Sequence, residues 1–116
     1  MSSKEEFALN LNGTSFSSCS FRATRYQTNG NLALQIVDAE GLVATCSVNP
    51  GVDVDNDHLC VKDYSENTGM LKFLIDKGVV EKPEYGIPSG WVTLFVCPLT
   101  ESGKELWVEE PRVVKE

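Results

Sequence analysis

Apolar and polar residues alternate with a period of two along much of the chain, which is the pattern of strands that bury one face. This pattern predicts strands at residues 7–11, 19–27, 32–37, 42–48 and 58–61. The Ser-rich residues 13–18 are expected to be a loop. Asn29-Gly30 is typical of a type I′ hairpin turn because both residues tolerate a positive φ angle. A second turn at residues 38–41 then returns the chain, so residues 19–48 are predicted to form an antiparallel meander.

Residues 91–97 are apolar on both alternating faces, which predicts a strand in the middle of a sheet. Trp91 and Phe95 are therefore expected to lie in the core. The preceding residues 81–90 contain two prolines and two glycines, and this composition predicts a surface loop.

The hydrophobic period changes to that of a helix at about residues 66–77. Ser65 or Asn67 is expected to cap the N-terminus of this helix with a side-chain oxygen, and Gly78 is suited to end it. The apolar stripe consists of Met70, Leu71, Phe73, Leu74 and Ile75. Together these patterns predict an α+β fold, in which a mainly antiparallel sheet of five to seven strands carries one α-helix on one face.

The length of 116 residues predicts a single domain, with a core at about residues 6–99 and a charged C-terminal tail at about 100–116. Within the tail, residues 106–108 fit an edge strand, because Pro111 is tolerated at an edge. The N-terminus lacks the features of a secretory signal, and no apolar run approaches the ~20 residues of a membrane helix. A cytoplasmic protein without membrane contact is expected, with its four cysteines as buried thiols.

The net charge of −7 is distributed unevenly along the chain. Residues 38–66 hold seven acidic residues against Lys62 alone, which gives this segment a net charge of −6. Direct binding to nucleic acid is disfavoured, because contacts to phosphates depend on clustered Lys and Arg. A basic surface on a partner protein is compatible with this charge, and so is a simple role in solubility.

Three aspartates in the acidic segment invite a comparison with calcium loops. Asp53, Asp55 and Asp57 match positions 1, 3 and 5 of an EF-hand loop. The match fails at position 6, where His58 replaces the turn-forming glycine, and at position 12, where Tyr64 replaces the bidentate glutamate. A solvated acidic loop without metal or cofactor is therefore the preferred interpretation.

His58 and Cys60 lie two residues apart, so on a strand they would face the same way and could form a nucleophilic pair. His58 is the only histidine, and the sequence identifies no group that would orient it. The cysteines lack the spacing of a structural zinc site, and the common phosphate-loop, dinucleotide and nucleophile-elbow motifs are missing. A non-catalytic protein is predicted. A small metal-dependent protein or enzyme using His58, Cys60 and nearby Asp residues is the alternative.

Three segments, at residues 25–49, 61–81 and 87–99, together resemble a family of small uncharacterised proteins. The most specific part begins at Lys62 and reads KDYSEN-G-L--L---GV. Members of that family occur in phages, plasmids and conjugative elements, notably of gut bacteria. The resemblance implies an accessory gene of a mobile element, a class that often serves persistence in the host and the countering of its defences. It carries over no catalytic residue.

The leading hypothesis is therefore a non-catalytic accessory protein of a bacterial mobile element that binds a partner protein through an acidic face. Trp107 could anchor a partner, although packing back over the sheet is favoured because large aromatic residues are mostly buried. A structural homodimer with paired edge strands is a third interpretation. The candidate partner-binding residues are Asp53, Asp55, Asp57, Asp63, Tyr64, Glu66 and Trp107.

Overall fold

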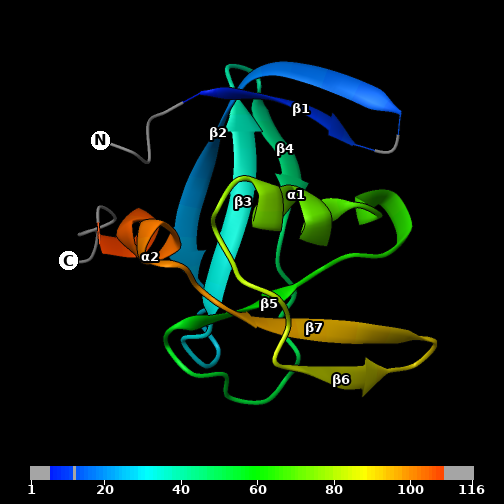
Figure 1. Cartoon of the computed structure of the whole chain (residues 1–116), viewed down its shortest axis with the longest axis vertical. Helices are drawn as coiled ribbons and strands as arrows, with labels where there is room; N and C mark the ends of the chain where they lie inside the picture. Colours follow the sequence, from blue (N-terminus) through cyan, green and yellow to red (C-terminus); the bar gives the residue numbers. More distant parts are fainter. Residues whose placement is uncertain (1–5, 12, 109–116) are drawn as a thin grey trace.

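The computed structural model describes residues 6–11 and 13–108, which form two antiparallel sheets and two α-helices (Figure 1). The predicted α+β fold with a mainly antiparallel arrangement is confirmed, although its seven strands are divided between two sheets and a second helix is present. The first sheet has the order β1-β2-β3-β4, and the second has the order β5-β7-β6. The elements are β1 (Phe7–Leu11), β2 (Thr14–Arg25), β3 (Leu32–Asp38), β4 (Gly41–Thr45), β5 (His58–Val61), a 3-10 helix (Ser65–Asn67), α1 (Met70–Asp76), β6 (Tyr85–Ser89), β7 (Val92–Pro98) and α2 (Glu101–Val108).

The long strand β2 takes part in two pairings. Its first half pairs with β1, and its second half pairs with β3, where Ala23 lies opposite Leu34. Ser18 has a positive φ of 57°, and the β1–β2 register shifts nearby, which marks a β-bulge where the strand bends. The predicted loop at residues 13–18 is therefore wrong, because residues 14–18 belong to β2.

The β2–β3 connection is longer than a two-residue turn. The Tyr26 N–H donates to the Asn31 carbonyl at 2.9 Å, and the Gly30 N–H donates to the Tyr26 carbonyl at 2.8 Å. Gly30 has a φ of 77°, whereas Asn29 does not adopt a positive φ. Asn29 instead accepts the Asn31 N–H through its side chain at 3.2 Å. The predicted hairpin and meander are confirmed, but the predicted type I′ turn is wrong.

The second sheet places β7 between β5 and β6, as the two apolar faces of residues 91–97 predict. The predicted loop at residues 81–90 is wrong for β6, which contains Pro88 and pairs along its length with β7. Proline lacks an N–H group and is therefore tolerated at the edge of a sheet, where one side of the strand has no ladder partner.

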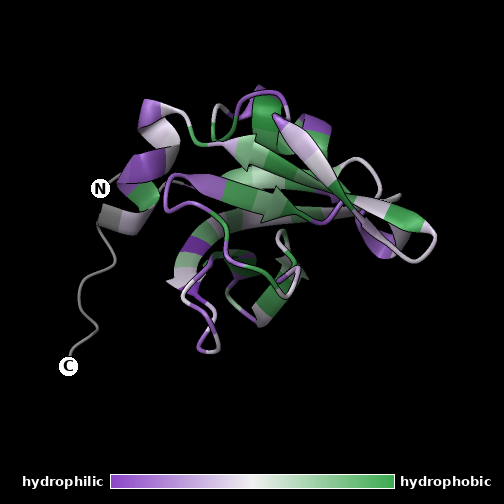
Figure 2. Cartoon of the chain, turned by 90° about the horizontal axis from the view of Figure 1, so that it is seen from below, coloured by the Kyte–Doolittle hydropathy of each residue, from purple (hydrophilic) through white to green (hydrophobic). Residues whose placement is uncertain are grey.

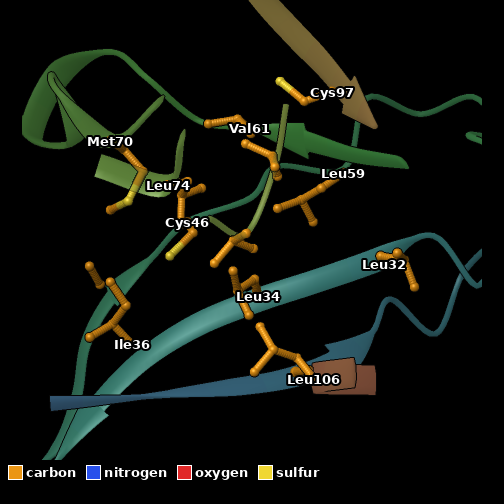
Figure 3. Close-up of a cluster of buried hydrophobic side chains, with 14 of the residues drawn as sticks. Leu32, Leu34, Ile36, Cys46, Leu59, Val61, Met70, Leu74, Cys97 and Leu106 are labelled. Atoms are coloured by element: carbon orange, nitrogen blue, oxygen red, sulfur yellow. The ribbon is translucent and has the colours of Figure 1, made fainter. Parts of the chain in front are cut away.

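The main core lies between the two sheets and α1 (Figure 3). Leu34 of β3, Leu59 of β5 and Leu74 of α1 are fully buried there. Burial of each such side chain typically stabilises a fold by about 1.5–3 kcal/mol. Figure 2 shows that hydrophobic residues gather mainly in the strands, whereas many hydrophilic residues lie in the loops and in α2.

The helix α2 occupies part of the predicted tail. Thr100 caps its N-terminus, because the Thr100 hydroxyl accepts the Gly103 N–H at 2.9 Å. Leu106 is only 6% exposed and belongs to the main core, so the core extends past the predicted limit at residue 99. The predicted edge strand at residues 106–108 is wrong. The rest of the tail, with Pro111, lies outside the described residues.

The helix α1 is shorter than the predicted helix at residues 66–77, and the 3-10 helix precedes it. Neither Ser65 nor Asn67 supplies the predicted side-chain cap. Instead, Asp63 Oδ1 accepts the N–H groups of Gly69 at 2.8 Å and Leu71 at 3.3 Å. The carboxylate of Asp63 therefore satisfies backbone donors that would otherwise have no partner at the start of the helix.

Candidate binding surface

The acidic loop, residues 49–57, covers one face of the second sheet. Val54 packs against a small buried cluster of Cys60, Leu94 and Val96, which is separate from the main core. Asp53 and Asp55 flank Val54 in the sequence of this loop. Asp53, Asp55 and Asp57 are all exposed, as the interpretation of a solvated loop requires.

The acidic loop is held in place by an amide network around Asn31, which is 5% exposed. The Asn31 side chain donates to Asn49 Oδ1 at 3.2 Å and to the Val52 carbonyl at 2.8 Å, and it accepts the Val54 N–H at 2.9 Å. Arg25 donates to Asn56 Oδ1 at 3.1 Å. These bonds fix the loop backbone, so little conformational entropy remains to be lost when the loop meets a partner.

His58 lies between two carboxylates at the end of the acidic loop. Its Nδ1 lies 2.7 Å from Asp57 Oδ1, and its Nε2 lies 2.8 Å from Glu84 Oε1. Burial by itself would lower the pKa of His58, but the hydrogen bonds and charges of Glu84 and Asp57 outweigh it and raise the pKa above its ordinary value. The hydrogen bond to His58 in turn lowers the pKa of Asp57.

Asp55, Asp57 and His58 place their nitrogen and oxygen atoms within 4.8 Å of one another, a spacing that invites comparison with metal sites. Asp53 is not part of this group. Both ring nitrogens of His58 already contact carboxylate oxygens, and a metal ligand must offer an unprotonated nitrogen. The arrangement therefore favours a protonated imidazole held by two carboxylates.

The hypothetical nucleophilic pair of His58 and Cys60 is not formed. Cys60 is 3% exposed, and burial raises the pKa of its thiol to about 11, so the reactive thiolate is disfavoured at neutral pH. The ring nitrogens of His58 are engaged by Asp57 and Glu84 instead. All four cysteines are free and buried, which confirms their prediction as buried thiols.

The residues before α1 have local structural contacts. Asp63 caps the helix, and Glu66 pairs with Lys62 at 2.6 Å. Tyr64 is half-buried and packs against the same small cluster as Val54 of the acidic loop. Tyr64 and the acidic loop thus pack on the same small cluster of the second sheet. Asp63 and Glu66 instead stabilise the start of α1 and the segment that precedes it.

Trp107 lies where the favoured interpretation placed it, whereas Trp91 does not. Trp107 packs against the main core, and its Nε1 donates to the Thr24 carbonyl at 2.8 Å, so its candidate role as a partner anchor is not supported. Trp91 was expected in the core, but it is fully exposed at 103%. It follows Gly90 in the β6–β7 turn, and the Ser89-Gly90 pair was a turn signal in the sequence. Phe95 packs against the main core, as expected.

Comparison with known proteins finds no matching family model, no similar curated protein and no similar solved structure. Among the described residues, neither helix is long and apolar enough to cross a membrane.

Proposed function

We propose that the chain is a non-catalytic protein-binding module. The observation that carries this proposal is Trp91, whose indole is fully exposed at the tip of the β6–β7 hairpin. Tryptophan is the residue type most enriched at the centres of protein interfaces, because a large apolar surface is removed from water when it enters a pocket. An exposed indole at a projecting tip is well placed to do this.

The charge of the acidic loop supports a basic surface on the partner. Ile87 and Val92 of the hairpin are half-buried and pack against the same small cluster as Val54 of the acidic loop. The hairpin and the acidic loop thus pack on one shared cluster, while His58 at the end of the acidic loop lies opposite Pro98, at the end of β7 away from Trp91. We propose that Trp91 supplies most of the affinity, and that Asp53, Asp55 and Asp57 supply orientation and a faster encounter.

The proposed setting is the cytoplasm of a bacterium that carries a mobile element, with a host protein or another protein of the element as the partner. The resemblance of residues 25–49, 61–81 and 87–99 to mobile-element proteins supports this setting. The acidic balance of the chain argues against direct contact with nucleic acid.

The test is affinity capture from a bacterial lysate with four baits read by quantitative mass spectrometry: the wild type, Trp91→Ala, the triple variant Asp53→Asn, Asp55→Asn and Asp57→Asn, and Leu42→Ala. Leu42 is 61% exposed and lies on the first sheet, so its variant controls for loss of any exposed apolar residue. We expect one protein to be retained by the wild type and by Leu42→Ala, and to be lost with Trp91→Ala.

The same partner, once purified, gives the sharper measurement by titration calorimetry. Trp91→Ala should weaken binding by about 30-fold, as a residue at the centre of an interface does. The triple Asn variant should weaken it less at high salt than at low salt. Equal affinity for the wild type and Trp91→Ala would contradict the proposal. Light scattering of the purified chain tests the alternative of a structural homodimer with paired edge strands.

A further inference from the structure

We propose that His58 is a proton-operated clamp that ties the two outer strands of the second sheet together across β7. His58 begins β5, and Glu84 immediately precedes β6, while β7 lies between these strands. The 2.8 Å contact from His58 Nε2 to Glu84 Oε1 therefore joins two strands that do not pair with each other. The 2.7 Å contact from Nδ1 to Asp57 fixes the other side of the ring to the acidic loop.

The chemistry of imidazole makes this clamp depend on one proton. A carboxylate only accepts hydrogen bonds, so a ring that bonds to carboxylates through both nitrogens must donate from both. The protonated ring has two N–H groups, whereas the neutral ring has one. Loss of the proton therefore removes one of the two hydrogen bonds.

The charged groups around His58 favour the protonated ring. Asp57 and Glu84 touch it directly, and Asp55 lies within 4.8 Å in the acidic loop. From α2, the positive charge of Lys104 acts on Asp57, and Lys104 lies 3.4 Å from Glu101. Opposite His58 on β7 is Pro98, which does not titrate. The carboxylates in direct contact outweigh burial, in agreement with the raised pKa of His58.

The clamp matters because β6 is an edge strand. Its backbone pairs with β7 on one side. Within residues 81–89, as far as the structure describes side-chain hydrogen bonds, the contact between Glu84 and His58 is the one that reaches another strand. Opening the clamp should loosen the start of β6 and leave the local surface one unit more negative. The clamp adjoins the proposed binding face, but it operates whether or not that face has a partner.

The direction of the pH dependence follows from linkage. A histidine whose pKa is raised by folding stabilises the fold fully at pH values below its unfolded pKa of about 6.5. This stabilisation is lost as the pH rises through the folded pKa. The second sheet should therefore become less protected against opening as the solution becomes more alkaline.

The test uses nitrogen NMR of the imidazole, which gives one unambiguous titration because the chain has a single histidine. Glu84→Gln is compared with Glu81→Gln, which changes an exposed glutamate in the same segment and serves as the matched control. We expect His58 to titrate above 6.5 in the wild type and in Glu81→Gln, and to titrate at a lower pH in Glu84→Gln.

Amide hydrogen exchange of the wild type, corrected for the intrinsic effect of pH, supplies the second readout. The protection of β6 should fall by about three- to tenfold across the His58 titration, since hydrogen bonds to partly exposed charges are of this strength. The proposal is overturned if His58 titrates at or below 6.5, or if β6 protection shows no step at that titration. A Glu84→Gln shift no larger than that of Glu81→Gln would equally overturn it, and both wild-type measurements stand even if a variant fails to fold.

Discussion

The two tryptophans of the chain lie in opposite surroundings. Trp107 on α2 packs against the main core and donates a hydrogen bond to the Thr24 carbonyl, whereas Trp91 at the hairpin tip is fully exposed. A large aromatic side chain stabilises a fold through the apolar area that it removes from water. Trp107 therefore supports the fold, while the whole surface of Trp91 remains available to another molecule.

One glycine in each of these two regions is required for a different reason. A Cβ atom at Gly103 of α2 would overlap the backbone carbonyl of Val79, so this glycine permits close docking of the helix. At Gly90, beside Trp91, a Cβ atom would meet open space, but φ is +61°. Packing thus specifies the α2 region, and backbone conformation specifies the hairpin tip. Substitutions in the two regions should separate these causes.

The largest effect is expected from Gly103→Ala. The added methyl group meets backbone atoms, which cannot move aside without displacing α2 from the sheet. We expect the free energy of unfolding to fall by about 2–4 kcal/mol, measured by urea titration. Ser102→Ala, at an exposed position on the same helix, should stay within about 0.5 kcal/mol of the wild type. A Gly103→Ala loss no greater than that of Ser102→Ala would show that packing does not specify this helix.

Trp107→Ala should have the next largest effect, a loss of about 2 kcal/mol, because Trp107 is half-buried and a fully buried Trp would cost more. Trp107→Phe retains a ring but removes the N–H donor to Thr24, so it should cost about 1 kcal/mol. Both values are measured by chemical denaturation. If neither variant loses stability, Trp107 does not support the fold.

Gly90→Ala should cost about 1 kcal/mol, because a residue with a Cβ atom is strained at a positive φ. Gly90→Asn should cost less, since asparagine tolerates this conformation better than alanine. Thermal unfolding measured by circular dichroism checks both variants. Equal losses of stability for Gly90→Ala and Gly90→Asn would mean that the positive φ at this position does not determine the cost of substitution.

Trp91→Ala should leave stability within about 0.5 kcal/mol of the wild type, because the side chain removes almost no area from water. Its exposure is checked independently by iodide quenching of fluorescence. The quenchable emission should disappear in Trp91→Phe and persist in Trp107→Phe. A marked loss of stability in Trp91→Ala would place the indole against the fold and weaken the proposed function.

The sequence predicted β1, β3 and β5 closely, because period-two alternation reports strands with one buried face. It did not predict β6, since Pro88 obscures a strand that only its edge position permits. It also missed α2, although Thr100 followed by an acidic residue is a helix-start signal. The apolar residues Leu106, Trp107 and Val108 follow one another at the end of this short helix, so no repeat is visible along its sequence.

The candidate site was predictable only where local pattern decides exposure. The three aspartates of the acidic loop are exposed as expected. The role of Asn31 could not be predicted, because its partners come from a segment that only the fold brings near. The same holds for Glu84 beside His58. The prediction that Trp91 is buried was wrong because the alternating pattern of β7 was extended to residue 91, which lies in a turn where alternation does not indicate burial.

The order of the strands has a consequence for how the chain folds. In the first sheet every pairing joins strands that follow one another in the sequence, so each requires only a short loop to close. In the second sheet, β5 and β7 are separated in the sequence by α1 and β6. Their pairing therefore closes a longer stretch of chain, which costs more loop entropy. We expect the first sheet to nucleate folding and the second to dock late. Mutations in β3 should then slow folding, whereas mutations in β6 should mainly accelerate unfolding.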